Sequence, residues 1–195
     1  MKMKNVFLVI IGLFCVGCST KMPNTYEEGI KKCEEQRDSM QLINPKIILI
    51  SHFDCLVGSK IPSIKSRSLT GKEIDSKYFS GKSGVINFWF EGCPPCVAEI
   101  PILNRIVDSL GQEEYFYLAI GRDDKIDILS FLQTHPWKFD QVENGKELIE
   151  SVFKLPWGYP ISLIVDKNGV ITHVEGGINE NDYSQFQERI LMASN

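Results

Sequence analysis

The sequence predicts an α/β protein in which helices flank a mixed central sheet. Two apolar segments, at 85–90 and 115–120, lack the alternation of a half-exposed strand and so indicate strands that are covered on both faces. A helical pattern at 97–110 lies between them, as expected for a parallel crossover. Later strand patterns at 161–165 and 170–175 are joined by a tight-turn sequence, which predicts an antiparallel hairpin.

Length and composition are those of one globular domain with appendages. The 195 residues are 43% apolar and 24% charged, which is ordinary for a packed domain. The formal net charge is −4, with no basic stripe. Because phosphate binding needs clustered lysine and arginine, we do not expect nucleic acid as a partner.

The first residues have the pattern of an export signal. Lys2 and Lys4 precede a mostly apolar segment at 5–17, shorter than the roughly 20 residues that span a bilayer. The pattern at Gly17-Cys18 resembles a bacterial lipoprotein signal, in which cleavage precedes an acylated cysteine. The alternative is an ordinary cleaved signal with Cys18 as an incidental thiol. We expect residues 1–17 to be removed, leaving a lipid-anchored envelope protein that faces the periplasm, a compartment that supports disulfides.

An extension at 18–54 is expected before the main domain, which we place at 55–195. After a short tether, Thr25 and Glu28 fit a capping box that opens a polar helix from Tyr26 to about Leu42. A strand is expected from Lys46 to Val57, with Phe53, Cys55 and Val57 on one face.

Two cysteines of this extension lie outside the main motif. Cys33 falls in the predicted helix and Cys55 in the predicted strand. A bridge between them would be structural, and the alternative is two buried free thiols. The sequence leaves both readings open, because it does not supply the geometry that a disulfide needs.

The remaining elements of the domain follow from shorter patterns. Short strands are expected on either side of the turn at 70–72. After the second buried strand we expect a helix, a short extended piece at 137–142, a short helix at 147–153 and a last helix from about Asn181. The first of the two longer helices carries its apolar residues at Ile126, Leu129, Phe131 and Leu132, and the last helix is expected to bury Tyr183, Phe186, Ile190 and Leu191.

A pair of cysteines follows the first buried strand. The sequence Cys93-Pro94-Pro95-Cys96 opens the helical pattern, where proline is tolerated because its missing N–H would have no partner. The unpaired N–H groups and positive dipole of a helix N-terminus favour a thiolate. Such sites lower a cysteine pKa from about 8.5 to roughly 3.5–7.5. The spacing therefore predicts redox chemistry, with Cys93 as the reactive thiol and Cys96 as its resolving partner.

Two other readings of this pair carry less support from the sequence. Half of a zinc site would need two further ligands at similar spacing, and neither the other cysteines nor the three histidines form such a pair. A purely structural bridge rarely needs a helix N-terminus and two prolines. We therefore expect neither a metal nor any cofactor beyond the redox-active disulfide itself.

These segments resemble the thioredoxin-like superfamily, and within it the TlpA/ResA group of envelope thiol-disulfide oxidoreductases. The resemblance covers roughly residues 55–193. It is carried by Gly84-Val85-Ile86-Asn87-Phe88-Trp89, Cys93-Pro94-Pro95-Cys96 and Ala98-Glu99-Ile100-Pro101, with support from Leu56-Val57-Gly58, Leu69-Thr70-Gly71 and Asp166-Lys167-Asn168-Gly169. The resemblance implies a three-layer thioredoxin-like fold, with Cys93 as the nucleophile and Cys96 as the resolving cysteine. It also implies that Pro160 is a cis-proline and that Tyr159 and Pro160 border the bound substrate.

The chain departs from the family pattern at two positions. Gly92 stands where the family usually has tryptophan, which we expect to uncover the dithiol. Asn87 stands where thioredoxins carry a buried acid that assists proton transfer. Glu91 and Glu99 are the nearest carboxylates in sequence, and we expect solvated surface roles for both, with general-base catalysis as the alternative. We expect Tyr159 at the rim of the site and Trp157 in the core.

The sequence therefore predicts an enzyme that exchanges electrons with cysteines of exported proteins. We expect it to act as a reductant fed by a membrane electron donor, and related envelope proteins include ones that serve cytochrome c maturation. A soft-metal module that holds Cu(I) through Cys93 and Cys96 is one alternative. A thiol peroxidase on the same fold is another, although it would usually have a Thr-x-x-Cys motif and a nearby arginine.

Overall fold

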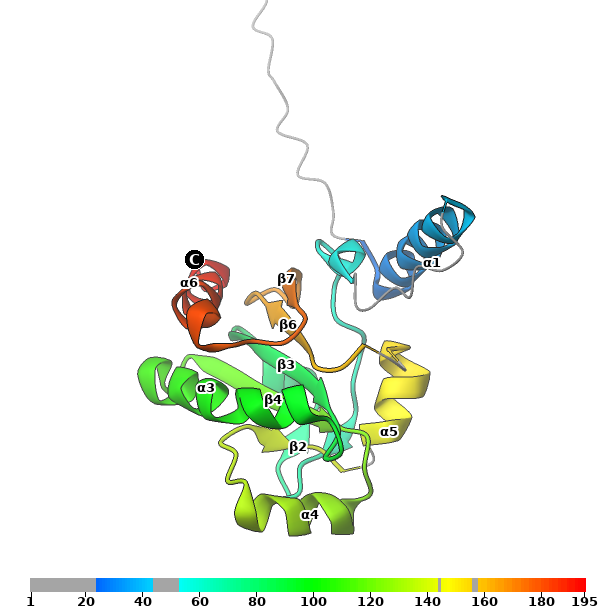
Figure 1. Ribbon diagram of the computed structural model, residues 1–195. Coiled ribbons are helices and arrows are strands. Elements are labelled where there is room, and N and C mark those ends of the chain that lie inside the picture. Colours follow the sequence, from blue (N-terminus) through cyan, green and yellow to red (C-terminus); the bar gives the residue numbers. More distant parts are fainter. Residues whose placement is uncertain (1–23, 44–52, 144, 156–157) are drawn as a thin grey trace, which may run out of the picture.

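The computed structural model describes residues 24–43, 53–143, 145–155 and 158–195, and it has the expected α/β architecture (Figure 1). Five strands form one mixed sheet in the order β5-β4-β3-β6-β7. The first three are mutually parallel, whereas β6 runs antiparallel to both β3 and β7. The strands are β3 (Ser83–Trp89), β4 (Tyr115–Gly121), β5 (Asp140–Gln141), β6 (Ile161–Val165) and β7 (Ile171–Glu175).

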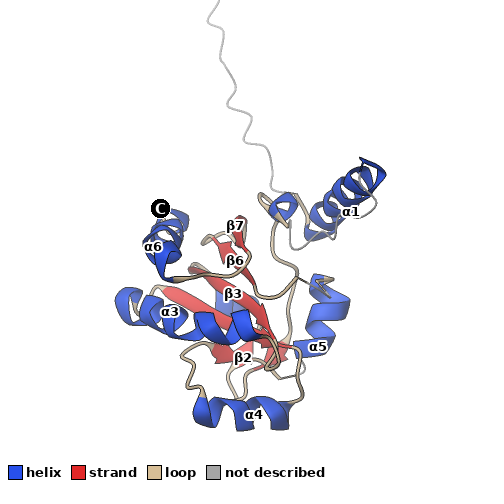
Figure 2. Cartoon of the chain, in the orientation of Figure 1, coloured by secondary structure: helices blue, strands red, loops and turns tan. Residues whose placement is uncertain are grey.

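Helices cover both faces of this sheet and give the three layers expected from the resemblance (Figure 2). On one face lie α3 (Pro94–Leu110), α4 (Lys125–Thr134) and α6 (Tyr183–Ala193). The other face is covered by α2 (Ser76–Phe79), by the short α5 (Gly145–Glu147) with the π-helix η2 (Leu148–Phe153), and by the start of α1 (Tyr26–Ile43). Strand β3 is fully buried, with Val85 and Trp89 in one apolar cluster and Ile86 and Phe88 in the other.

The two predicted hairpins are present. β1 (Ser66–Arg67) pairs antiparallel with β2 (Glu73–Ile74) around the turn at 70–72. Between β6 and β7, Asp166 Oδ1 accepts hydrogen bonds from the backbone N–H groups of Asn168 and Val170. The aspartate thereby holds the turn closed, as its position at the start of the turn sequence predicts.

The N-terminal extension packs onto the domain through α1. The predicted capping box is formed, because Thr25 N donates to Glu28 Oε2 (2.7 Å) and Glu28 N donates to Thr25 Oγ1 (3.2 Å). The hydroxyl of Tyr26 donates to the carbonyl of Phe153 (2.8 Å). A Cys33–Cys55 disulfide joins α1 to the 3₁₀ turn η1 (Asp54–Leu56), so of the two readings left open by the sequence the structure has the bridge.

The predicted strand at 46–57 is wrong where the structure describes it. Residues 54–56 form a 3₁₀ turn in which the consecutive residues Cys55 and Leu56 are both buried, while Val57 is 39% exposed. A turn buries neighbouring side chains together, whereas a strand alternates them. Residues 1–23 and 44–52 lie outside the described residues, so the signal segment, the acylation of Cys18 and the first part of this strand stay predictions. Among the helices that the structure describes, none is long and apolar enough to span a membrane.

Two helices differ in part from the expected pattern of buried residues. In α4 the buried side chain is Ile128, with Phe131 packed on Trp89 at a ring separation of 5.2 Å. Ile126 is 79% exposed, because it lies two residues before Ile128 and so on nearly the opposite side of the helix, and Leu129, about 100° around the helix from Ile128, is 43% exposed. In α6, Phe186 and Ile190 lie in the core as expected and Ala193 joins them, whereas Leu191, which we also expected to be buried, is 42% exposed.

The disulfide of the extension is expected to stabilise the fold without taking part in electron exchange. The bridge closes a loop of 22 residues, and the loop-entropy relation gives about 3 kcal/mol for that length. We expect the Cys33→Ser/Cys55→Ser variant to lose about this free energy of unfolding in urea titrations and to keep its rate of thiol-disulfide exchange. A variant that unfolds as before and exchanges more slowly would contradict this structural role.

Candidate active site

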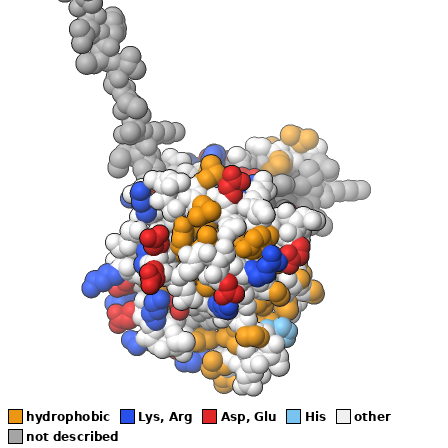
Figure 3. All heavy atoms as spheres, turned by 90° about the vertical axis from the view of Figure 1, so that its left-hand side faces the viewer, with side chains coloured by type: hydrophobic (Ala, Val, Ile, Leu, Met, Phe, Trp, Pro, Cys, Tyr) orange, Lys and Arg blue, Asp and Glu red, His pale blue; other side chains and the backbone are white. Residues whose placement is uncertain are grey.

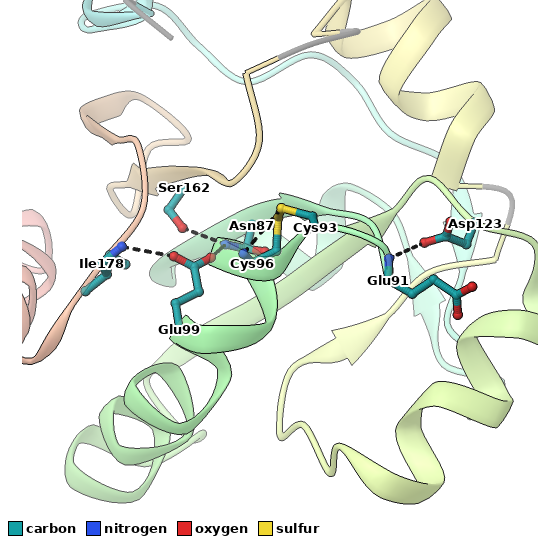
Figure 4. The surroundings of a disulfide bond; sticks show 8 residues. All are labelled: Asn87, Glu91, Cys93, Cys96, Glu99, Asp123, Ser162 and Ile178. Carbon is teal, nitrogen blue, oxygen red and sulfur yellow. Dashed lines mark hydrogen bonds between the residues drawn. A yellow bond between two sulfur atoms is a disulfide. The ribbon is translucent and has the colours of Figure 1, made fainter. Parts of the chain in front are cut away.

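The end of β3 and the start of α3 place the two cysteines. Cys93 is the N-cap residue of α3, in extended backbone conformation, and Pro94 and Pro95 are the first two helical residues. Because neither proline has an N–H, the first free amide of the helix belongs to Cys96. It donates to Cys93 Sγ at 3.3 Å (Figure 4). The helix therefore directs its N-terminal donor at the sulfur that we expect to act as the nucleophile.

Cys93 and Cys96 form a disulfide in this structure. Cys93 is 3% exposed, whereas Cys96 is completely buried. An attacking thiolate from another protein therefore meets Cys93 first. The same helix N-terminus would stabilise the Cys93 thiolate once the bond is reduced, through the Cys96 N–H and the helix dipole.

Tyr159 and Pro160 are joined by a cis peptide bond, as expected for Pro160. Pro160 is buried immediately before β6, the strand that lies next to β3. Tyr159 is half-buried, and its hydroxyl donates to the carbonyl of Leu155 (2.7 Å). Burial raises the pKa of Tyr159 to about 12, so the hydroxyl is neutral. The expected core packing of Trp157 lies outside the described residues.

The expectation that Gly92 uncovers the dithiol is wrong, because Cys93 is only 3% exposed. Phe90, two residues before Gly92, supplies an aromatic ring near the place where the family usually has tryptophan. The ring of Phe90 lies beside Gly92, where a Cβ would be 3.6 Å from it, and meets the ring of Tyr159 edge-on at 5.7 Å. Phe90 and Tyr159 both pack against the apolar cluster that contains the two cysteines.

The backbone of Glu91, rather than its carboxylate, is tied to the site. Glu91 N donates to Asp123 Oδ2 at 2.7 Å, which anchors the loop between β3 and α3 to the loop that follows β4. Figure 4 shows the Glu91 carboxylate directed away from the disulfide. Its exposure agrees with the surface role expected for it.

Glu99 is the residue that sequence reasoning misplaced. Its side chain is 1% exposed, so the expected surface role is wrong. Oε1 accepts a hydrogen bond from Asn87 Nδ2 (2.7 Å) and Oε2 accepts one from Ile178 N (3.1 Å). A signal was present, because Glu99 lies three residues after Cys96 and four before the buried Leu103, which places all three on one face of the helix.

Glu99 places a buried acid beside the dithiol from helix α3. The strand position at which thioredoxins carry their buried acid is occupied here by Asn87. Burial raises the pKa of Glu99 from its ordinary 4.5 to about 7, against the opposing effect of the hydrogen bonds from Asn87 and Ile178. A carboxyl group with a pKa near the working pH is suited to give and take a proton. Its place on the helix face of Cys96 makes that thiol the natural partner for the proton.

Glu99 is expected to make the stability of the fold depend on pH. Because its pKa is about 7 when folded and about 4.5 when unfolded, the folded state binds the proton more tightly. The stabilisation is fully present below about pH 4.5 and is lost as the pH rises through about 7, by about 3 kcal/mol in all. Urea titrations over this range are expected to show the loss, and the Glu99→Gln variant to lack it. A variant with the same pH dependence would contradict this assignment.

Comparison with known proteins agrees with this geometry. A family model described as the AhpC/TSA family matches residues 57–174, which is more than half of the chain and contains the dithiol, Glu99 and Pro160. The chain belongs to the AhpC/TSA family.

Curated relatives of this chain carry the name thiol-disulfide oxidoreductase ResA. One from Bacillus thuringiensis is 28% identical over 137 residues, which cover 69% of this chain and 78% of that protein. Another from Geobacillus thermodenitrificans is 25% identical over 136 residues, covering 69% and 78%.

Solved structures show the same fold at lower identity. A thiol:disulfide interchange protein DsbE from Chlorobium tepidum matches with a TM-score of 0.61 and 24% identity, over 69% of this chain and 94% of that one. The thioredoxin domain of a thiol-disulfide oxidoreductase from Bacteroides vulgatus matches with a TM-score of 0.60 and 24% identity, over 69% and 97%. The thioredoxin-like fold expected from the sequence is therefore confirmed.

The surface of the protein carries both positive and negative side chains. On the face shown in Figure 3, acidic and basic side chains are interspersed, with apolar side chains between them. Across the described part of the chain, no group of three or more histidine, cysteine, aspartate or glutamate side chains is placed to hold a metal ion.

Proposed function

We propose that this protein is a thiol-disulfide oxidoreductase that passes electron pairs between its Cys93–Cys96 dithiol and disulfides of exported proteins. The observation that carries the proposal is the position of this pair, with Cys93 at the N-cap of a 17-residue helix and the first free amide of that helix on its sulfur. The names of the curated relatives support the same class of reaction.

The reaction proceeds in two exchanges. The Cys93 thiolate attacks one sulfur of the substrate disulfide, forming a mixed disulfide and releasing a substrate thiolate that takes up a proton. Cys96 then gives its proton to the Glu99 carboxylate and attacks Cys93 Sγ. This forms the Cys93–Cys96 disulfide and releases the second substrate thiolate, which is protonated in turn. Two electrons pass to the substrate, and the dithiol is oxidised.

The direction and place of this reaction are part of the proposal. We propose that the protein acts as a reductant on disulfides of exported proteins and is recharged by a membrane electron donor. Acylation of Cys18 would hold it at a membrane of the cell envelope, facing the periplasm. The lipoprotein-like pattern that ends at Cys18 supports this placement.

A single-turnover assay tests the proposed direction. The reduced protein is mixed with insulin, and in parallel the oxidised protein is mixed with reduced insulin chains. We expect release of insulin thiols with one Cys93–Cys96 disulfide formed per reaction, and slower reaction in the opposite sense. Faster oxidation than reduction would overturn the reductant assignment, and no change in insulin thiols in either direction would overturn the proposed function.

A further inference from the structure

A buried amide connects the sheet to the acid beside the dithiol. The carboxamide of Asn87 on β3 has no exposed surface, and its Nδ2 donates both to Glu99 Oε1 (2.7 Å) and to Ser162 Oγ on β6 (2.9 Å). Figure 4 shows the three side chains converging next to the disulfide. The other end of the amide, Asn87 Oδ1, is buried without a hydrogen-bond partner among the described residues.

This arrangement suits only the ionised form of Glu99. Its two oxygens each face an N–H group, Asn87 Nδ2 and Ile178 N, and both groups can only donate. A protonated carboxyl would need an acceptor for its own hydrogen, and neither group supplies one. A buried donor left without a partner is unfavourable. An unused acceptor lies nearby, because Asn87 Oδ1, at the end of the amide that faces away from Glu99, has no hydrogen-bond partner among the described residues.

We propose that the Asn87 carboxamide turns by half a revolution when Glu99 gains a proton, and turns back when Glu99 loses it. In the turned state Oδ1 accepts the Glu99 hydrogen and the hydroxyl hydrogen of Ser162, whose rotor is free to change from acceptor to donor. Asn87 thus offers Glu99 a donor in one protonation state and an acceptor in the other, at the cost that in the turned state Nδ2 takes the place of the unpartnered Oδ1. It is a positioning residue, since it acts on the reacting sulfurs only through Glu99.

The inference deepens the proposed function and rests on it in one respect, because the proton that Glu99 exchanges is assigned to Cys96. The pKa of Glu99 responds to burial and to the hydrogen bonds from Asn87 and Ile178, and to no neighbouring charge. Reduction adds the thiols of Cys93 and Cys96 as titrating groups. The other ionisable side chains on the elements around Glu99 are all exposed or half-buried. They are Arg105, Asp108, His173, Glu175, Glu180, Asp182, Tyr183, Glu188 and Arg189.

Nuclear magnetic resonance of the oxidised protein tests the half-turn directly, with no dependence on activity. The Glu99 carboxyl carbon is titrated, and cross-relaxation between the Asn87 amide protons and the Ser162 β-protons is measured at each pH. We expect this contact above the Glu99 pKa and its loss below, with the same midpoint as the carboxyl titration. A contact that persists while Glu99 titrates would overturn the proposal, and so would a Glu99 that does not titrate between about pH 5 and 9.

The Asn87→Leu variant separates a turning amide from a fixed donor. If the amide serves both forms of Glu99, its removal leaves the proton affinity of Glu99 nearly unchanged. If the amide is a fixed donor that serves only the carboxylate, its removal raises the proton affinity of Glu99 by more than roughly tenfold. We expect less than a tenfold change, and a larger rise would overturn the proposal. Ser83→Ala is the matched control, since Ser83 is buried in the same strand and its hydroxyl has no partner among the described residues.

These measurements also keep the inference separate from the proposed function. A failed insulin assay, with the Asn87–Ser162 contact still following the Glu99 titration, would refute the redox role and leave the half-turn standing. The reverse result would leave the oxidoreductase in place and remove only the turning amide.

Discussion

Replacing Cys96 with serine is expected to turn the protein into a trap for its substrates. The Cys93 thiolate would still attack a disulfide, but the mixed disulfide would have no second thiol to resolve it. The reduced Cys96→Ser variant, mixed with insulin and quenched with acid, should accumulate close to one adduct per protein on Cys93. Non-reducing mass spectrometry with peptide mapping measures both the amount and the position of the bond.

The Cys93→Ser variant is the control for this trap. Its remaining thiol, Cys96, is completely buried, so it should form no adduct and should lose at least about a thousandfold in exchange rate. Adducts on Cys96 in amounts equal to those on Cys93 would show that either sulfur can attack. That outcome would contradict the assignment of Cys93 as the nucleophile.

Replacing Glu99 with glutamine is expected to slow the resolving step by about a hundredfold near pH 8, since positioned general bases typically contribute 10²–10⁴. The variant keeps the shape of the side chain but cannot take the Cys96 proton. Stopped-flow mixing of the reduced protein with a disulfide separates formation of the mixed disulfide from its resolution. Only the second step should slow, and its inflection near pH 7 should disappear.

Glu91→Gln is the matched control, because Glu91 is an exposed carboxylate near the same cysteines and points away from them (Figure 4). It should leave both steps unchanged. If Glu99→Gln resolves the mixed disulfide at the normal rate with the normal pH profile, Glu99 is a structural acid and the proton leaves Cys96 by another route.

The parts of the fold that the sequence predicted well are those with strong local signals. The strand at 85–90 and the helix after Cys93 have clear signals, because one is apolar except for Asn87 and the other opens with two prolines. The register of α4 was not predictable from apolar residues alone, since Ile126, Ile128 and Leu129 point in different directions and only tertiary packing selects Ile128. The turn at 54–56 was hidden for a similar reason, because its buried residues also fit a short strand.

The sequence predicted the two redox-active cysteines of the site but not the buried acid beside them. Cys93, Cys96 and Pro160 lie in recognisable motifs, whereas Glu99 has a residue type that usually lies at the surface. Its burial depends on Asn87 and Ile178, which are 12 and 79 residues away along the chain. Such a contact becomes visible only when the strand, the helix and the loop before η3 (Glu180–Asp182) are brought together.

Equilibration of the protein in thiol-disulfide buffers of graded potential, with each cysteine pair mapped by mass spectrometry, tests the central claim most directly. The account predicts that Cys93–Cys96 behaves as a reversible two-electron couple toward the thioredoxin end of the known range, about −270 mV, while Cys33–Cys55 stays oxidised. A value near the oxidising end, about −120 mV, would reverse the proposed direction of electron flow. The absence of any reversible Cys93–Cys96 couple would contradict the claim itself.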